Sequence, residues 1–160
     1  MWSRKRIDIT WTSLFAACWS TFVPPGGSQA GRRAESALSE TDAIACLSVR
    51  SGFDLLLTER QFPAGSEILM SAITIPDMPR IVASHGLVAV PVDICPSTMS
   101  VDCERIRSHI TPETKAIVVA HLFGTIPDLD PVAALARQHN LLLIEDCAQA
   151  LDGRRYPGHP

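Results

Sequence analysis

From residue 41 onward, short apolar segments alternate regularly with amphipathic segments that have helical spacing. We expect the apolar segments to be strands, at residues 43–49, 67–73, 87–94, 115–123 and 141–146. The intervening segments are expected to be helices, at residues 52–60, 77–85, 100–110 and 128–140. Near-continuous apolar strands that alternate with helices are typical of a parallel sheet with both faces covered. The sequence therefore predicts an α/β fold, a three-layer α/β/α domain with a mostly parallel sheet.

Proline and capping residues indicate where several of these elements lie or end. Pro91 interrupts the ladder of its strand, which predicts an edge strand or a bulge. Ser100 is a candidate N-cap for the helix that follows it. Asp130 is the expected N-cap of the last helix, with Pro131 at its first position and Asn140 as its stop.

The first 40 residues have a different character from the rest of the chain. Residues 1–23 combine a basic start with a mildly apolar stretch, which is compatible with a signal for export or with an amphipathic segment. Asp8 interrupts the apolar run, and the run is too short to span a bilayer. Residues 24–40 are rich in Pro, Gly, Ser and charge and read as a linker. We therefore expect an N-terminal amphipathic segment and linker over 1–40 and one domain over 41–160.

Composition limits the classes of function. A net charge of -3 offers no broad basic surface for nucleic acid. The cysteines are odd in number and form no CxxC pair, which argues against a zinc site and against a disulfide framework. They lie at Cys18, Cys46, Cys95, Cys103 and Cys147. Free thiols in a reducing cytoplasm and no metal are the expectation.

Polar residues stand where three of the expected strands end, and such ends are where parallel sheets bind ligands. Asp93 could pair with Asp146, or it could simply cap a helix or form a loop. His121 could act as a general base or be a satisfied histidine beneath a pocket. Cys147 is not expected to be a nucleophile, because the neighbouring Asp146 raises its pKa.

Asp146 is the most informative of these residues. A carboxylate at the end of a buried strand is costly unless it meets a cation or several donors. One use for it is to hold the protonated ring nitrogen of pyridoxal phosphate. Phosphate-binding elements are weaker: there is no GxGxxG after the first expected strand and no P-loop motif. Ser51 and Gly52 stand before a helix start, where they could hold a phosphate or form a simple turn.

Several motifs in register point to a known family. They are "GSEIL", "PVDI", "TPETKAIV", "HLFG", "PDLDPV" and above all "IEDCAQA". From about Cys46 to about Pro160 the chain resembles the DegT/StrS-type aminotransferases, many of which act on nucleotide-linked keto-sugars. The resemblance implies the large domain of a fold type I transferase that depends on pyridoxal phosphate. It also implies a homodimer, a small-molecule amino donor (commonly glutamate) and a carbonyl acceptor.

Site residues carry over position by position from the resemblance. Asp146 takes the place of the partner of the pyridinium nitrogen, and Gln149 that of the residue near the cofactor's 3-hydroxyl. Ser51 and Gly52 match the family's phosphate turn, in which Phe53 replaces the usual threonine. Ile75 stands where the family places a ring-stacking aromatic residue. Both departures suggest a divergent subgroup.

The family's Schiff-base lysine has no counterpart. Lys115 matches an ordinary lysine before a strand, and Lys5 lies outside the resemblance. We therefore expect no catalytic residue here and read the chain as the N-terminal part of an aminotransferase, inactive alone. The alternatives are a stand-alone module that binds a phosphate ligand or a partner, and an unrelated doubly wound domain of the receiver type.

Overall fold

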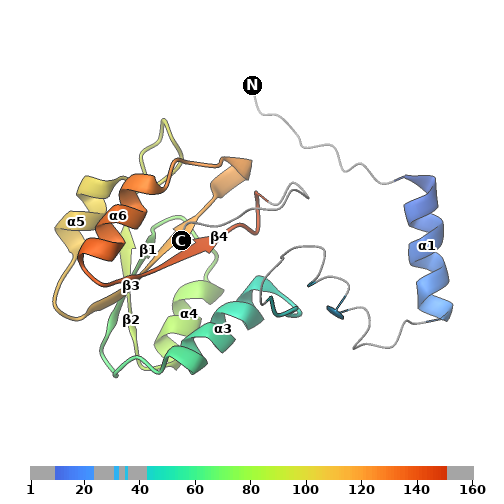
Figure 1. The fold of residues 1–160 in the computed structure, drawn as a ribbon, viewed down its shortest axis with the longest axis horizontal. Helices are drawn as coiled ribbons and strands as arrows, with labels where there is room; N and C mark the ends of the chain where they lie inside the picture. Colours follow the sequence, from blue (N-terminus) through green and yellow to red (C-terminus); the bar gives the residue numbers. More distant parts are fainter. Residues whose placement is uncertain (1–9, 24–30, 33–34, 36–42, 151–160) are drawn as a thin grey trace. The chain divides into compact units, whose positions relative to one another are not determined.

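A four-stranded parallel sheet forms the centre of the larger of the two units into which the chain divides, Met1–Ala45 and Cys46–Pro160 (Figure 1). The computed structural model describes residues 10–23, 31, 32, 35 and 43–150. Its strands are β1 (Glu67–Ser71), β2 (Val88–Val92), β3 (Thr114–Ala120) and β4 (Leu142–Asp146). They lie in the order β2-β1-β3-β4, and every pairing is parallel. The carboxyl ends of all four strands therefore lie on the same side of the sheet, where the pairing of β3 with β4 places Ala120 opposite Asp146.

Helices cover both faces of this sheet (Figure 1). One face packs against α3 (Val49–Arg60) and α4 (Asp77–Ser84), and the other against α5 (Cys103–His109) and α6 (Asp130–Gln138). Successive strand residues point to opposite faces. Ile68 and Met70 accordingly lie in the core beneath α3 and α4, and Leu69 lies in the core beneath α5 and α6. The predicted three-layer α/β/α fold is confirmed.

One predicted strand is wrong. Residues 43–46 have no regular structure, and α3 begins at Val49. The apolar side chains of this stretch are not buried, since Ile44 is 75% and Leu47 is 101% exposed. Ser48 instead caps the helix, because its Oγ accepts a hydrogen bond from the N–H of Ser51. An apolar run without a partner strand thus leads directly into a helix.

The predicted element ends are partly confirmed. Pro91 lies in an edge strand as expected. The N-cap of α5 is Asp102 and not Ser100, which is buried and whose carbonyl accepts a hydrogen bond from the N–H of Cys95. Helix α6 already includes Asp130, so Pro131 occupies its second position, not its first. Asn140, with a φ of 53°, follows the end of α6 as predicted.

The cap of α5 supports a stability prediction. The Oδ1 atom of Asp102 accepts a hydrogen bond of 2.8 Å from the N–H of Arg105. We expect Asp102→Ala to lower the free energy of unfolding by about 1 kcal/mol, as loss of an N-cap does. Urea denaturation monitored by circular dichroism would measure it. Glu104→Ala is the control, because its 3.8 Å ion pair with Arg107 is exposed and should contribute little. Equal losses in both variants would contradict the capping role.

In the N-terminal unit the structure describes one long helix, α1 (Trp11–Phe22), which Thr10 caps. None of its residues is buried, and Trp11, Phe15, Trp19 and Phe22 are each at least 70% exposed. Among the described residues no helix is long and apolar enough to cross a membrane. The predicted linker at 24–40 and the predicted boundary at residue 40 lie almost wholly outside the described residues and remain predictions.

Candidate functional site

A cavity of about 470 Å³ opens at the carboxyl ends of the strands, on the side of α3 and α4. It lies between the start of α3, the loop after β1 and the segments that follow β3 and β4. This is where parallel α/β sheets bind their ligands, and the volume suits a small cofactor. The lining residues that matter most for its chemistry are Ser48, Arg50, Ile75, Phe123, Asp146 and Gln149.

Asp146 reaches the cavity because of its position in β4. Leu142 and Ile144 pack against the α3/α4 core, and alternation directs the side chain of Asp146 to the same face. Its Oδ1 atom accepts a hydrogen bond of 3.1 Å from the N–H of Ala148. Its carbonyl oxygen accepts one of 3.0 Å from the N–H of His121. Both the strand and the following turn therefore hold this carboxylate in place.

Gln149 joins the two loops that border the cavity. Its Oε1 atom accepts a hydrogen bond of 2.8 Å from the N–H of Phe123. Phe123 has a φ of 55° within the short 3-10 helix η1 (Leu122–Gly124), so its backbone is in the left-handed region. Because the oxygen of the amide is used in this way, the amide nitrogen is oriented as a donor. The role of Phe123 was not predicted, since nothing in the local sequence requires a left-handed phenylalanine.

The predicted phosphate turn does not border the cavity. Ser51 and Gly52 lie within the first turn of α3, and the N–H of Gly52 donates to the carbonyl of Ser48. Phe53 is 4% exposed and belongs to the core with Leu57. The cavity thus brings together Asp146, Gln149 and Ile75, but not Ser51, Gly52 or Phe53. The cofactor contacts assigned to these six residues remain predictions.

Two residues that sequence reasoning did not single out, Ser48 and Arg50, border the cavity from the start of α3. The guanidinium of Arg50 lies 3.6 Å from the carboxylate of Asp77, and both side chains are about half exposed. Such an exposed pair is weak. The start of α3 therefore offers a cation and the positive end of a helix to the cavity.

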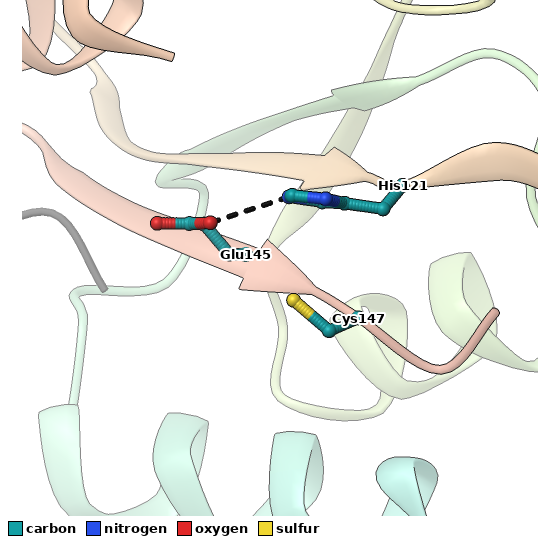
Figure 2. A group of neighbouring side chains, drawn as sticks. All are labelled: His121, Glu145 and Cys147. Carbon is teal, nitrogen blue, oxygen red and sulfur yellow. Dashed lines mark ion pairs between the residues drawn. The ribbon is translucent and has the colours of Figure 1, made fainter. Parts of the chain in front are cut away.

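Alternation from Val119 and Leu143, which pack in the α5/α6 core, places His121 and Glu145 on the face opposite the cavity. Their side chains lie next to each other (Figure 2). The Nε2 atom of His121 is 3.2 Å from the Oε2 atom of Glu145; the His121 side chain is 0% exposed and that of Glu145 is 14% exposed. His121 does not border the cavity, so the general-base alternative is not supported by its position. The contact with Glu145 is an ion-pair distance and not a well-directed hydrogen bond. Asp93 is exposed at the end of β2, on the other edge of the sheet from Asp146. These two acids are therefore not a pair.

Cys147 follows β4 directly, lies near His121 and Glu145, and does not line the cavity. Burial raises the pKa of its thiol, and the carboxylates of Glu145 and Asp146 raise it further. The direction expected from the sequence is confirmed, although burial is the largest cause. The thiol is therefore protonated at neutral pH and is a poor nucleophile.

Lys115 lies far from the cavity. It is the second residue of β3, and its Nζ atom donates a hydrogen bond of 2.9 Å to the carbonyl of Pro112. The cavity is at the other end of the same strand, about 16 Å away at 3.3 Å per residue. Lys5 lies outside the described residues. No lysine in the part of the chain that the structure describes reaches the cavity.

The parallel sheet, its two helical layers and an acid that borders a cofactor-sized cavity at the end of β4 are features of one class of proteins. They match part of the large domain of the fold type I transferases, which use pyridoxal phosphate. Residues 32–160 match the DegT/DnrJ/EryC1/StrS aminotransferase family, and the chain belongs to it. The match begins earlier than the resemblance read from the motifs, which started near Cys46. Membership excludes the receiver-type alternative.

Two relatives illustrate the family. The chain is 37% identical to L-glutamine:2-deoxy-scyllo-inosose aminotransferase of Micromonospora echinospora over 148 residues. That alignment covers 89% of this chain and 35% of the relative. The chain is also 39% identical to GDP-perosamine synthase of Caulobacter vibrioides over 116 residues. That alignment covers 72% of this chain and 31% of the relative. The chain therefore spans about a third of the length of the curated relatives that it matches.

Solved structures agree with this assignment. NtdA from Bacillus subtilis, solved with the cofactor PMP bound, superposes with a TM-score of 0.79 at 26% identity, over 89% of this chain and 35% of its own. The aminotransferase from Psychrobacter cryohalolentis gives a TM-score of 0.77 at 28% identity, over 94% of this chain and 40% of its own. Family members of this kind are aminotransferases that depend on pyridoxal phosphate.

Proposed function

We propose that the cavity binds pyridoxal phosphate and that the chain contributes half of a cofactor site to an aminotransferase. The observation that carries this proposal is the Asp146 carboxylate, held in the cavity with the Gln149 amide fixed beside it. An acid at this position can accept a hydrogen bond from the ring nitrogen and keep that nitrogen protonated. When bound, the cofactor serves as an electron sink for the carbon that carries the amino group.

The remaining lining residues fit the other parts of the cofactor. The Gln149 amide nitrogen can donate a hydrogen bond to the 3-oxygen of the ring. Ile75, which is 45% exposed, offers an aliphatic surface to the face of the ring. The start of α3, with Arg50 beside it, suits the phosphate group. Ser51 and Gly52 could contribute there only after a local change of the first turn, so we place Ser48 and Arg50 ahead of them.

Catalysis needs a lysine that this cavity does not receive from the described residues, because Lys115 lies at the opposite end of β3. We propose that the chain is the N-terminal part of the catalytic unit and has no transaminase activity alone. The one-third coverage of its relatives supports this proposal. Pairing with a lysine-bearing segment would complete the site, and a homodimer is the assembly that we propose for the complete enzyme. A stand-alone module that binds the cofactor without catalysis is the second candidate.

The substrates follow from the family and not from the cavity. We propose a keto-sugar or a related cyclic ketone as the amino acceptor, because the named relatives act on an inosose or make an amino sugar. Glutamate remains the predicted donor, and L-glutamine is its competitor since the name of one relative specifies it. A comparison of the two donors in the lysine-complemented protein would decide between them.

Cofactor binding is the direct test. Isothermal titration of the chain with pyridoxal phosphate should show one saturable site, and pyridoxal without phosphate should bind much more weakly. We expect Gln149→Ala to weaken binding by about two- to tenfold, the effect of one neutral hydrogen bond. Gln138→Ala, at the exposed end of α6, is the matched control and should have no effect. Absence of saturable binding in the folded chain would overturn the proposal.

A further inference from the structure

A cluster of three potential metal ligands lies on the sheet face opposite the cavity: His121, Glu145 and Cys147 (Figure 2). His121 follows β3, Glu145 is in β4, and Cys147 follows β4. The register of the two strands, with Ala120 opposite Asp146, brings the three side chains together. One ligand atom from each residue lies within 4.8 Å of the other two. Neither His121, Glu145 nor Cys147 lines the cavity, so the cluster is a separate site.

The types of ligand and their spacing suit zinc. Imidazole nitrogen, carboxylate oxygen and thiolate sulfur are the three ligand classes that Zn²⁺ takes in proteins. With bonds of about 2.1 Å, two such nitrogen and oxygen ligands of a tetrahedral ion stand about 3.4 Å apart. The Nε2 of His121 and the Oε2 of Glu145 are 3.2 Å apart, close to this edge. A thiolate ligand, with a bond of about 2.3 Å, requires an edge of about 3.6 Å, which a small rotation of Cys147 would provide.

Charge balance also favours a divalent cation. The carboxylate of Glu145 lies among buried groups, since its side chain is only 14% exposed and that of His121 is 0% exposed. Ionisation of the nearby Cys147 thiol on metal binding would add a second negative charge. One Zn²⁺ ion neutralises both charges. The partial exposure of Cys147 leaves a side from which the ion and a water molecule can enter.

We propose that His121, Glu145 and Cys147 bind one Zn²⁺ ion, with water as the fourth ligand. Binding moves the thiol proton of Cys147 to solvent as the sulfur–zinc bond forms. Because the proton competes with the ion wherever the thiol is protonated, affinity rises about tenfold per pH unit over that range. The ion would join the ends of β3 and β4, next to Asp146 in the sequence.

Titration with Co²⁺, a spectroscopic substitute for zinc, tests the proposal in the full chain. We expect one equivalent to bind with a thiolate-to-cobalt charge-transfer band, and excess Zn²⁺ to remove the band. Cys147→Ser should abolish the band, and His121→Asn and Glu145→Gln should each weaken binding at least about tenfold. His85→Asn is the matched control, since His85 also pairs with a carboxylate, Asp54, but the described residues form no cluster of metal ligands around it.

A second measurement uses the unaltered protein and so does not depend on whether the variants fold. Hydrogen bonds with Ser97 and Thr98 lower the pKa of Cys95 to about 7, so this thiol should react readily with an alkylating reagent. Zn²⁺ should slow alkylation of Cys147 and leave Cys95 unchanged, as peptide mass spectrometry would show. Equal protection of both thiols, no protection of Cys147, or a charge-transfer band that survives in His121→Asn would overturn the proposal. Asp146→Asn should retain the metal, which separates this site from the cofactor site.

Discussion

Asp146→Asn is expected to weaken the binding of pyridoxal phosphate by about ten- to a hundredfold. The carboxylate lines the cavity, and a turn hydrogen bond from Ala148 holds it in place. A hydrogen bond to a charged group contributes about 1.5–3 kcal/mol, which corresponds to this change in affinity. Asparagine keeps the shape and the acceptor from the turn but loses the negative charge. Isothermal titration and fluorescence of the bound cofactor would measure the loss.

The chain offers a matched control for this substitution. Asp93 also follows the carboxyl end of a parallel strand, but it lies at the opposite edge of the sheet and outside the cavity. Asp93→Asn makes the same chemical change and should leave the dissociation constant unaltered. Circular dichroism must show that both variants are folded. Similar affinities of the two variants for pyridoxal phosphate would remove Asp146 from the cofactor site.

The part of the fold that the sequence predicts rests on the pattern of apolar residues and on the residues that interrupt strands and helices. The buried strands of a parallel sheet are apolar along their length, so the sequence correctly predicts β1, β3 and β4. Pro91 correctly indicates an edge because it cannot donate to a neighbouring strand. Residues 43–49 have the same apolar composition, yet they form no strand. Among the described residues they pair with none of the four strands, and strand pairing is a property of the tertiary structure.

The candidate site also has one part that the sequence predicts and one part that it does not. The sequence correctly places Asp146 at a strand end, and alternation within β4 then decides that its side chain faces the cavity. The predicted phosphate contacts near Ser51 depend on where α3 begins, and helix starts are decided by capping. Ser48 caps the helix three residues earlier than Ser51, so Ser48 and Arg50 border the cavity instead.

The His121, Glu145 and Cys147 cluster could not be found from local spacing. Zinc motifs are recognised by ligands a few residues apart, such as CxxC, and this chain has none. Here the histidine and the two later ligands come from the ends of adjacent strands, which a helix separates in the sequence. Only the register between β3 and β4 brings them together. Ligands from neighbouring parallel strands therefore become visible only once the strand pairing is known.

His121→Leu is expected to lower the free energy of unfolding by about 3–5 kcal/mol in buffer with a chelator. The His121 side chain is fully buried, that of Glu145 is 14% exposed, and Nε2 of His121 lies 3.2 Å from Oε2 of Glu145. Loss of one partner leaves the carboxylate buried without its compensating group, which accounts for a cost of this size. The chelator ensures that bound metal contributes nothing to the difference. Urea denaturation, with the slope checked for two-state behaviour, is the measurement.

Two further variants separate this cost from a simple loss of packing. The double substitution of His121→Leu with Glu145→Leu removes both polar groups, so it should be less destabilising than His121→Leu alone. His85→Leu disrupts the pair with Asp54, which has a shorter distance of 2.8 Å but an Asp54 side chain that is 58% exposed. We expect that variant to lose less than about 1 kcal/mol. If His121→Leu lowers the free energy of unfolding no more than His85→Leu does, burial does not strengthen the pair of His121 and Glu145. In that case the ends of β3 and β4 would be held by their backbone hydrogen bonds, such as the one from His121 to Asp146.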